Sequence, residues 1–254
     1  MRAAVEVEAL RPAMTPCRRA QAWLVDLVKR RALRSLHATS RGEALLLEAY
    51  LWAEEGAEGA ILDDLRSAAL PPWLANQVAR HADDEARHAS LLRDRLSELG
   101  GARGLPVDRL SRWKLRALER IVLGSACGFR EGQKVPLFAV AFRMEAMGVR
   151  VLERHLEVCA TLEARAGKAL ATRAVLAGIA ADERRHVLAC ERTLLGLVDA
   201  AELPLLVEIL HRIDKVERAF GISSSIALWV SGGYFQVLRA AQRLGDRSAR
   251  RVAS

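Results

Sequence analysis

The segment Asp84-Glu85-Ala86-Arg87-His88 occurs a second time as Asp182-Glu183-Arg184-Arg185-His186, and both copies read Asp-Glu-x-Arg-His. In each copy the glutamate precedes the histidine by three residues. Residues at that spacing are neighbours on one face of an α-helix. Each segment therefore predicts a helix that presents a carboxylate and an imidazole together, and the repeat indicates that two such helices share one site.

Two further glutamates stand in the same relation to each other as the two motifs. The motifs start 98 residues apart, and Glu55 and Glu153 are separated by the same distance, each 30 residues before the glutamate of its motif. A Glu-x-x-His pair from each of two helices, with one glutamate from each of two more, is the ligand set of a dinuclear carboxylate centre in a four-helix bundle. The predicted metal ligands are Glu55, Glu85, His88, Glu153, Glu183 and His186.

Other residues compete for places in this ligand set. The 98-residue offset favours Glu55 with Glu153, but both predicted helices contain further glutamates. His81 lies one helical turn before Glu85, although a hydrogen-bonded core histidine is the more frequent role for such a residue. The competing glutamates are Glu48, Glu54 and Glu58 in the first helix and Glu145 and Glu157 in the third.

The aspartates of the two motifs have a predicted role of their own. A histidine that binds a metal usually donates its second ring N–H to a carboxylate, which fixes the orientation of the ring. Across an antiparallel pair of helices, each aspartate can reach the histidine of the other motif. We therefore expect Asp84 to hold His186, and Asp182 to hold His88.

The composition predicts an all-α protein. Ala, Leu, Arg and Glu dominate, 51% of the residues are apolar and strand-like alternation is absent. We expect a single domain over residues 1–254, because this length suits one helical domain with a large core. Its predicted parts are an N-terminal helix at about 14–38, a bundle core at about 40–198 and C-terminal helices at about 202–244.

Local signals divide the bundle core into four long helices. The first starts at a Ser40-x-x-Glu43 capping box and ends by Pro71-Pro72, and the second stops at Gly100-Gly101. The connection over 101–133 is long and holds a further helix at about 108–127, as a ferritin-like crossover requires. The predicted bundle helices are 40–69, 73–99, 136–165 and 168–199, and the C-terminal ones are 204–220 and 222–244.

Cysteine spacing and the chain start bear on the compartment. The four cysteines form no C-x-x-C pair, and charged residues interrupt positions 1–20, so no signal peptide is predicted and a reducing cytoplasm is expected. Residues 220–235 are apolar but lack the roughly 20 uninterrupted apolar residues that span a bilayer. We expect no membrane span; this segment caps the bundle, with a homodimer surface as the alternative.

The charge balance leaves the question of an RNA partner open. The formal net charge is +8, and basic residues collect within the first 35 positions and again after residue 238. Such clusters attract phosphates if they meet on one face. Aromatic residues suited to base stacking are not interleaved with them, which weakens the case for nucleic acid. An arginine-rich proteome is the favoured explanation of the charge.

The stretch Val78-Ala79-Arg80-His81-Ala82-Asp83-Asp84-Glu85-Ala86-Arg87-His88-Ala89-Ser90-Leu91-Leu92 resembles the ferritin-like di-iron carboxylate superfamily, and within it the MiaE-like tRNA hydroxylases. Glu145-Ala146-Met147-Gly148 is similar to the third helix of that group, which favours Glu145 over Glu153. The resemblance covers roughly residues 40–195. It implies Glu85 and Glu183 as carboxylate ligands that often bridge, and His88 and His186 as one imidazole ligand per metal.

The resemblance also implies the chemistry. Two iron ions, or an iron and manganese pair, would react with O2 and an electron donor, so we expect an oxidoreductase, namely a hydroxylase or monooxygenase. Its substrate is a small molecule or a tRNA nucleoside. One alternative is a ferroxidase or iron-binding protein with no organic substrate, against which the crossover and the extra terminal helices argue. The other is a non-catalytic ferritin-like scaffold for interactions.

Overall fold

The computed structural model describes residues 10, 15–58, 63–65, 70–101, 109–167 and 170–252, and every regular element in these ranges is helical. The predicted all-α class is confirmed. In the described ranges, no helix is both long and apolar enough to cross a membrane. The elements are α2 (Pro16–Leu36), α3 (Ser40–Trp52), η1 (Ala53–Glu58), α5 (Pro72–Glu98), α6 (Arg109–Ser125), η2 (Ala126–Gly128), α7 (Lys134–Ala166), α8 (Ala171–Leu197) and α9 (Leu203–Val252).

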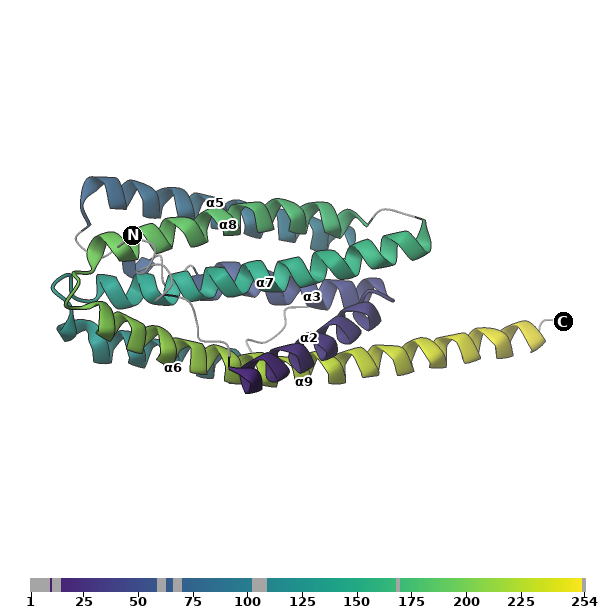
Figure 1. The fold of residues 1–254 in the computed structure, drawn as a ribbon. Coiled ribbons are helices and arrows are strands. Elements are labelled where there is room, and N and C mark those ends of the chain that lie inside the picture. The colour runs from purple at the N-terminus through teal and green to yellow at the C-terminus, as the bar shows by residue number, and fades with distance from the viewer. Residues whose placement is uncertain are drawn as a thin grey trace.

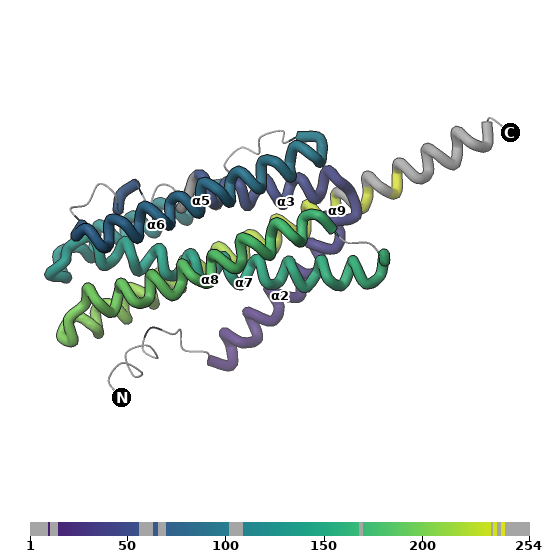
Figure 2. The backbone as a smooth tube through the Cα atoms, turned by 90° about the horizontal axis from the view of Figure 1, so that it is seen from above, coloured from purple at the N-terminus to yellow at the C-terminus, as the bar shows by residue number. Residues whose placement is uncertain are grey.

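The long helices lie in three layers (Figure 1). Helices α5 and α8 form the first, α3 and α7 the second, and α2, α6 and α9 the third, which covers the face of α7 turned away from α8. One core cluster joins α3, α5, α7 and α8 in the first two layers, and Figure 2 shows these helices running alongside one another. This cluster consists of Ala44, Leu47, Leu92, Leu96, Leu152, Leu176, Ile179 and Ala180.

The start of α3 differs from the predicted capping box. Thr39 is the N-cap, because its hydroxyl oxygen accepts a hydrogen bond from the Gly42 backbone N–H over 3.0 Å. Glu43 turns inward instead of capping the helix: it is buried and accepts hydrogen bonds from Arg95 on α5 and Thr172 on α8. Burial with cationic and hydroxyl partners satisfies this carboxylate better than an exposed cap would, so Glu43 ties three helices together.

The first bundle helix changes its winding at Ala53. A single α-helix was predicted over 40–69, whereas the structure has an α-helix to Trp52 and a π-helix over Ala53–Glu58; residues 59–62 and 66–69 lie outside the described ranges. A π-helix has a wider turn than an α-helix and is frequent at functional sites. The change of winding alters which side chains of this segment face the neighbouring helices.

Glycines mark the predicted end of the second bundle helix. Gly100 and Gly101 have φ angles of 98° and 81°, a left-handed region that glycine enters without a steric penalty. The Gly101 N–H donates to the Leu96 carbonyl over 2.9 Å and closes the last turn of α5. The prediction of a stop at Gly100-Gly101 is confirmed. The helix expected in the following connection is also present, as α6.

The two predicted C-terminal helices form one continuous helix, α9. The prediction of a break near Gly221 is wrong. A glycine inside a helix costs only about 1 kcal/mol relative to alanine, and packing of α9 against α2, α6 and α7 offsets that cost. The serine hydroxyls that follow donate back to carbonyls of the preceding turn, as Ser223 does to Ala219 over 3.0 Å, so their polar groups are satisfied within the helix.

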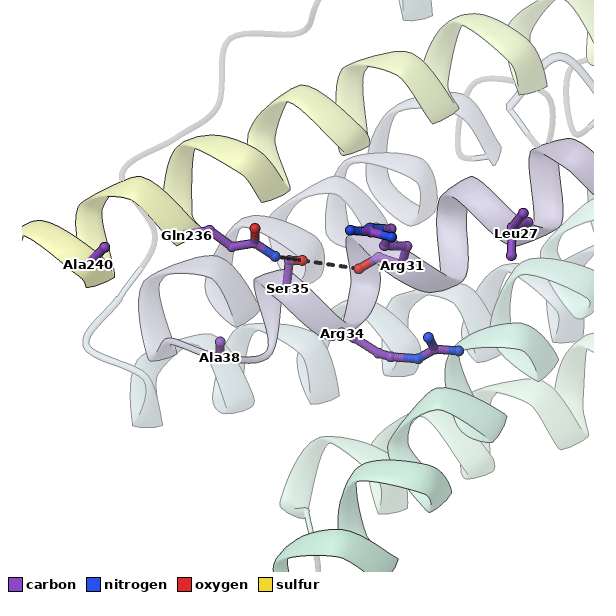
Figure 3. A pocket seen from close by; sticks show the side chains of 7 residues that line it. All are labelled: Leu27, Arg31, Arg34, Ser35, Ala38, Gln236 and Ala240. Atoms are coloured by element: carbon purple, nitrogen blue, oxygen red, sulfur yellow. Dashed lines mark hydrogen bonds between the residues drawn. The ribbon is translucent and has the colours of Figure 1, made fainter.

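Helices α2 and α9 approach each other closely at Gly232. A Cβ atom on this glycine would lie 3.3 Å from the Ser35 Cβ, which leaves little room for any larger residue. Beside this crossing is a surface hollow of about 570 Å³, where the Gln236 side chain donates to Ser35 Oγ over 2.6 Å and Ser35 Oγ donates to the Arg31 carbonyl (Figure 3). None of the glutamates or histidines of the repeat lines this hollow.

Candidate metal centre

Both halves of the repeated motif face the interior between α5 and α8. Glu85 and His88 on α5, and Glu183 and His186 on α8, are at most 5% exposed. Each motif lies mid-helix among apolar residues of the core, so its spacing of three residues aims both functional groups the same way. The structure brings together the four residues that the repeat predicted.

One group of possible metal ligands forms around His88. Its members are Glu54, Glu85, His88 and Glu183, whose ligand atoms all lie within 4.8 Å of one another. His88 Nδ1 is 3.4 Å from Glu54 Oε2, 3.4 Å from Glu85 Oε2 and 3.6 Å from Glu183 Oε1. We call these four residues the His88 group.

A second group forms around His186. It consists of His81, Glu85, Glu145 and His186, again with all ligand atoms within 4.8 Å. His186 Nδ1 is 3.1 Å from Glu85 Oε1 and 3.6 Å from Glu145 Oε2, and His81 Nε2 is 2.9 Å from Glu145 Oε1. We call these four residues the His186 group. Glu85 belongs to both groups, with Oε2 facing His88 and Oε1 facing His186.

Each histidine is held from outside by an aspartate of the other helix. His88 Nε2 donates to Asp182 Oδ2, and His186 Nε2 donates to Asp84 Oδ2, each over 3.1 Å. The two predicted cross-helix contacts are confirmed. Because Nε2 carries the donated proton, the lone pair of a neutral ring lies on Nδ1, which points at the carboxylates. Arg87 contacts both aspartates near the surface.

Several inward-facing atoms of the two groups are buried without a hydrogen bond to the described residues. In the part of the chain that the structure describes, Glu54 Oε2, both Glu85 oxygens, Glu145 Oε2 and the Nδ1 atoms of His88 and His186 are buried without a hydrogen-bond partner. Buried polar groups without partners are costly, and several carboxylates placed together repel one another. A divalent cation in each group would satisfy these atoms and offset their charge.

The distances suit metal ligation. Two ligand atoms that lie about 2.1 Å from an ion, at about 90–110° to each other, are about 3.0–3.4 Å apart. The nitrogen-to-oxygen distances within the two groups range from 2.9 to 3.6 Å. The residues present therefore fit two ions that share Glu85.

The buried charges shift each other's protonation. Burial raises the pKa of Glu54 to about 8, with the neighbouring Glu85 adding to the effect. Burial acts to raise the pKa of Glu85 as well, but the surrounding imidazoles, led by His186, hold it below its usual range. For His88 and His186 burial acts to lower the pKa, and the adjacent carboxylates raise it to about 10. Without metal these rings carry protons, which a metal ion would displace.

Glu55 and Glu153 lie outside both groups. Glu55 forms an ion pair with Arg93, Glu153 pairs with Arg184 over 2.8 Å, and the two carboxylates are 42% and 43% exposed. The places expected for them are taken by Glu54 and Glu145. In η1 the π-helical winding turns Glu54 inward, and on α7 Glu145 lies two turns before Glu153, level with the motifs. The 98-residue offset thus relates two surface residues.

The remaining candidates have other surroundings. Glu48 lines a cavity, Glu157 pairs with Arg30 over 2.5 Å, and the side chain of Glu58 lies outside the described residues. His81, expected as a core histidine with ligation as the alternative, faces the carboxylates of the His186 group. The sequence similarity around Glu145 favoured that glutamate over Glu153, and Glu145 is the one of the two that belongs to a ligand group. No sequence signal marks the π-helix that selects Glu54.

A largely apolar cavity of about 430 Å³ adjoins the His88 group. It lies between α3 and α7 on one side and α2, α6 and α9 on the other, and Glu54 and Glu183 form part of its wall. Gly148 lines it beside Glu183, where a Cβ atom would come within 3.1 Å of Glu183 Oε2. This volume falls in the range of about 300–1,000 Å³ that small-molecule sites occupy.

A third cluster of potential ligands lies apart from these groups. It contains His37, His155 and Cys159. Tyr50 hydrogen-bonds to His155 Nδ1 over 2.9 Å, the two imidazoles meet through their Nε2 atoms, and His37 Nδ1 faces Glu43 at 3.8 Å. Burial lowers the pKa of His155 to about 3, so its ring is neutral. These contacts engage both ring nitrogens of His155 and Nε2 of His37, whereas His37 Nδ1 has no hydrogen-bond partner among the described residues.

Comparisons of this chain with protein-family models, with curated proteins and with solved structures returned no match. The candidate metal centre therefore rests on the chemistry and geometry of its own residues.

Proposed function

We propose that the chain is a ferritin-like dinuclear metalloprotein that activates O2 and oxidises a small organic molecule, as a hydroxylase or monooxygenase. The observation that carries the proposal is the sharing of Glu85 between two histidine–carboxylate groups whose rings are oriented by Asp84 and Asp182. Helices η1, α5, α7 and α8 contribute these residues. This supports the proposal, because four helices supply the ligands in dinuclear carboxylate proteins.

The residues divide between two ions. Glu54, His88 and Glu183 would hold one ion and Glu145, His186 and His81 the other, and Glu85 belongs to both groups. Oxygen-rich ligands with a few imidazoles suit iron or manganese. Two ferrous ions, when bound, supply electrons to O2. The protein's own contribution is to orient the rings through the aspartates, to exclude water from the buried carboxylates and to hold the substrate nearby.

The cavity supports an organic substrate over iron storage. Its wall is largely apolar, with side chains such as Leu46, Trp52 and Met147, and it reaches Glu54 and Glu183. Ions in transit prefer oxygen ligands and water, whereas apolar walls bind carbon skeletons. The covering helices α2, α6 and α9 build the outer wall, which gives the helices outside the four-helix core a role in substrate binding.

Metal content tests the proposal first. Protein produced with supplemented iron should contain about two ions per chain by mass spectrometry of the metals. Glu85→Ala should lose most of both, while Glu153→Gln, which changes an exposed carboxylate, should keep them. A wild-type protein that binds no metal under these conditions would refute the dinuclear centre.

Oxygen uptake then separates the two functional classes. The reduced, iron-loaded protein should consume O2 faster when an apolar small molecule is present, and mass spectrometry should find an oxygenated product. Oxidation of many ferrous ions per chain without any organic product would instead establish a ferroxidase. RNA that co-purifies at low salt and is lost in moderate salt would point to a tRNA nucleoside as the substrate.

A further inference from the structure

We infer that the substrate of this site is an amphipathic organic anion, whose apolar body fills the cavity beside Glu54 and Glu183 and whose negative group binds Lys29. The inference rests on the proposed function for the reaction, but the binding it describes does not require a metal.

The cavity wall is suited to an apolar chain or ring. Side chains from the second and third layers meet there, and most of them are aliphatic, aromatic or thioether groups. Burying apolar surface in such a cavity contributes about 25 cal/mol per Å² of area removed from water. The apolar wall includes Leu33, Leu46, Trp52, Met144, Met147 and Phe220.

One part of the cavity meets the candidate metal centre. Glu54 and Glu183, both members of the His88 group, line it directly. Gly148 allows this approach, because a larger residue would press on the Glu183 carboxylate. A substrate atom in this part of the cavity would lie beside the His88 group, where oxidation is proposed.

Another part of the cavity is cationic. Lys29 from α2, Lys114 from α6 and Arg154 from α7 all line it. Lys114 pairs with Glu217 over 2.9 Å, and Arg154 pairs with Asp26 over 2.6 Å. Lys29 has no ion pair or hydrogen bond with the described residues.

The positive charges around Lys29 are not balanced by the negative charges nearby. Burial lowers its pKa to about 8, and the repulsion of Arg154 and Lys114 outweighs the attraction of Glu217 and Asp26, which are engaged with other cations. A carboxylate, phosphate or sulfate on a ligand would pair with the ammonium and complete its hydrogen bonds. This is the one place in the cavity, within the described chain, where a cation lacks a partner.

The two parts are separated by a length that sets the size of the ligand. Gly148 lies beside Glu183 at one end of the cavity, and Arg154 lies at the cationic end. The two residues are six positions apart on α7, which corresponds to a helical rise of about 9 Å. The oxidised atom and the negative group would therefore be separated by several carbon atoms. Medium-chain fatty acids and aromatic acids with a spacer have this form.

Calorimetric titration of decanoate into the metal-free protein tests the inference. Wild type should bind decanoate, and Lys29→Met should bind it at least tenfold more weakly, whereas Lys29→Arg should retain most of the affinity. Decan-1-ol, which has the same chain without the charge, should bind wild type and Lys29→Met alike. Lys215→Met removes an exposed lysine of α9 and should leave decanoate binding unchanged.

A second variant addresses the apolar body of the ligand. Val151→Phe narrows the cavity from the α7 side and should weaken decanoate and decan-1-ol together. Equal binding of decanoate by wild type and Lys29→Met would overturn the role of Lys29. Failure of wild type to bind decanoate, or tighter binding of decyltrimethylammonium, would overturn the anionic class.

Metal content of the same preparations separates this inference from the proposed function. Lys29→Met should load iron as wild type does, because Lys29 is in neither ligand group. Decanoate binding by a protein that never binds metal would refute the dinuclear oxygenase and leave the anion site standing. Full metal loading without decanoate binding would refute the anion site and leave the dinuclear centre standing.

Discussion

His88 on α5 donates its Nε2–H to Asp182 on α8 over 3.1 Å, and the same contact, at the same length, joins His186 to Asp84 in the opposite direction. The aspartate of each motif thus orients the imidazole of the motif on the other helix. This reciprocity explains why aspartate adjoins glutamate in both copies of Asp-Glu-x-Arg-His. It also ties metal binding to correct packing of α5 against α8.

Removal of one aspartate should weaken the metal centre without unfolding it. Asp182→Asn replaces an ionised acceptor of the His88 N–H with a neutral amide, and loss of such a contact typically costs about 10–100-fold in metal affinity. Competition with a chromophoric chelator would measure the affinity. Asp83→Asn, beside the other motif but exposed, is the control and should bind metal as wild type does. Equal affinities for Asp182→Asn and the control would contradict the role of Asp182.

Charge-neutral variants should distinguish the inward glutamates from their neighbours. Glu54→Gln and Glu145→Gln change carboxylates of the two groups and should each reduce bound metal markedly, because an amide is a poor ligand for these ions. Glu55→Gln and Glu153→Gln change exposed, arginine-paired carboxylates and should retain nearly two ions per chain. The measurement is metal content after gel filtration. Loss of metal from Glu55→Gln and Glu153→Gln, with retention in Glu54→Gln and Glu145→Gln, would instead support Glu55 and Glu153 as ligands.

Gly148 should tolerate even a methyl group poorly. In Gly148→Ala the new Cβ would lie 3.1 Å from Glu183 Oε2 and push the carboxylate from its place. Metal content should fall, although alanine is the better helix former by about 1 kcal/mol. Gly178→Ala on α8 meets nothing within 4 Å and should keep its metal while matching or exceeding wild-type thermal stability. Full metal loading of Gly148→Ala would show that Glu183 can move without consequence.

His155 should make the fold sensitive to acid. Its pKa is about 3 in the folded protein, where burial lowers it, and its ordinary value is 6.5. Between these values the unfolded chain binds one more proton than the folded chain, so stability falls as the pH falls through this range, by up to about 1.4 kcal/mol per pH unit.

Urea unfolding at pH 6.5 and pH 5.0 would measure this dependence. His155→Gln cannot titrate, so on going to pH 5.0 the wild type should lose roughly 1.5 kcal/mol more of its unfolding free energy than the variant does. The comparison cancels the contributions of titrating groups that do not contact His155, because the two proteins share them. Parallel losses in the two proteins would mean that His155 is protonated in the folded state.

The repeated motif carried most of what could be predicted. A spacing of three residues on a helix fixes which side chains share a face, so the meeting of Glu85, His88, Glu183 and His186 and the cross-contacts of Asp84 and Asp182 followed from local geometry. The all-α class followed from composition. These features depend on regular helices, and regular helices are what a sequence pattern describes.

The errors occurred where helices depart from regularity or where packing overrides local signals. Glu54 faces the centre through a π-helix that has no sequence signature, and the equal offsets of Glu55 and Glu153 describe two surface residues. Glu43 reads as a cap but is buried against Arg95 and Thr172. Gly221 predicted a break between two helices, yet α9 continues through it and packs against neighbouring helices. In each case contacts distant in sequence decide the outcome.

Because Glu85 faces both groups, binding of an ion in one group should change the affinity of the other group for its ion. An ion bound beside His88 would fix the Glu85 carboxylate and offset part of the negative charge, and its effect on a second ion beside His186 must equal the effect of that ion on the first. Preordering of the carboxylate favours the second ion, whereas repulsion between cations opposes it. If the first ion strengthens binding of the second, chains with one ion are rare when metal is scarce; if it weakens binding, such chains accumulate.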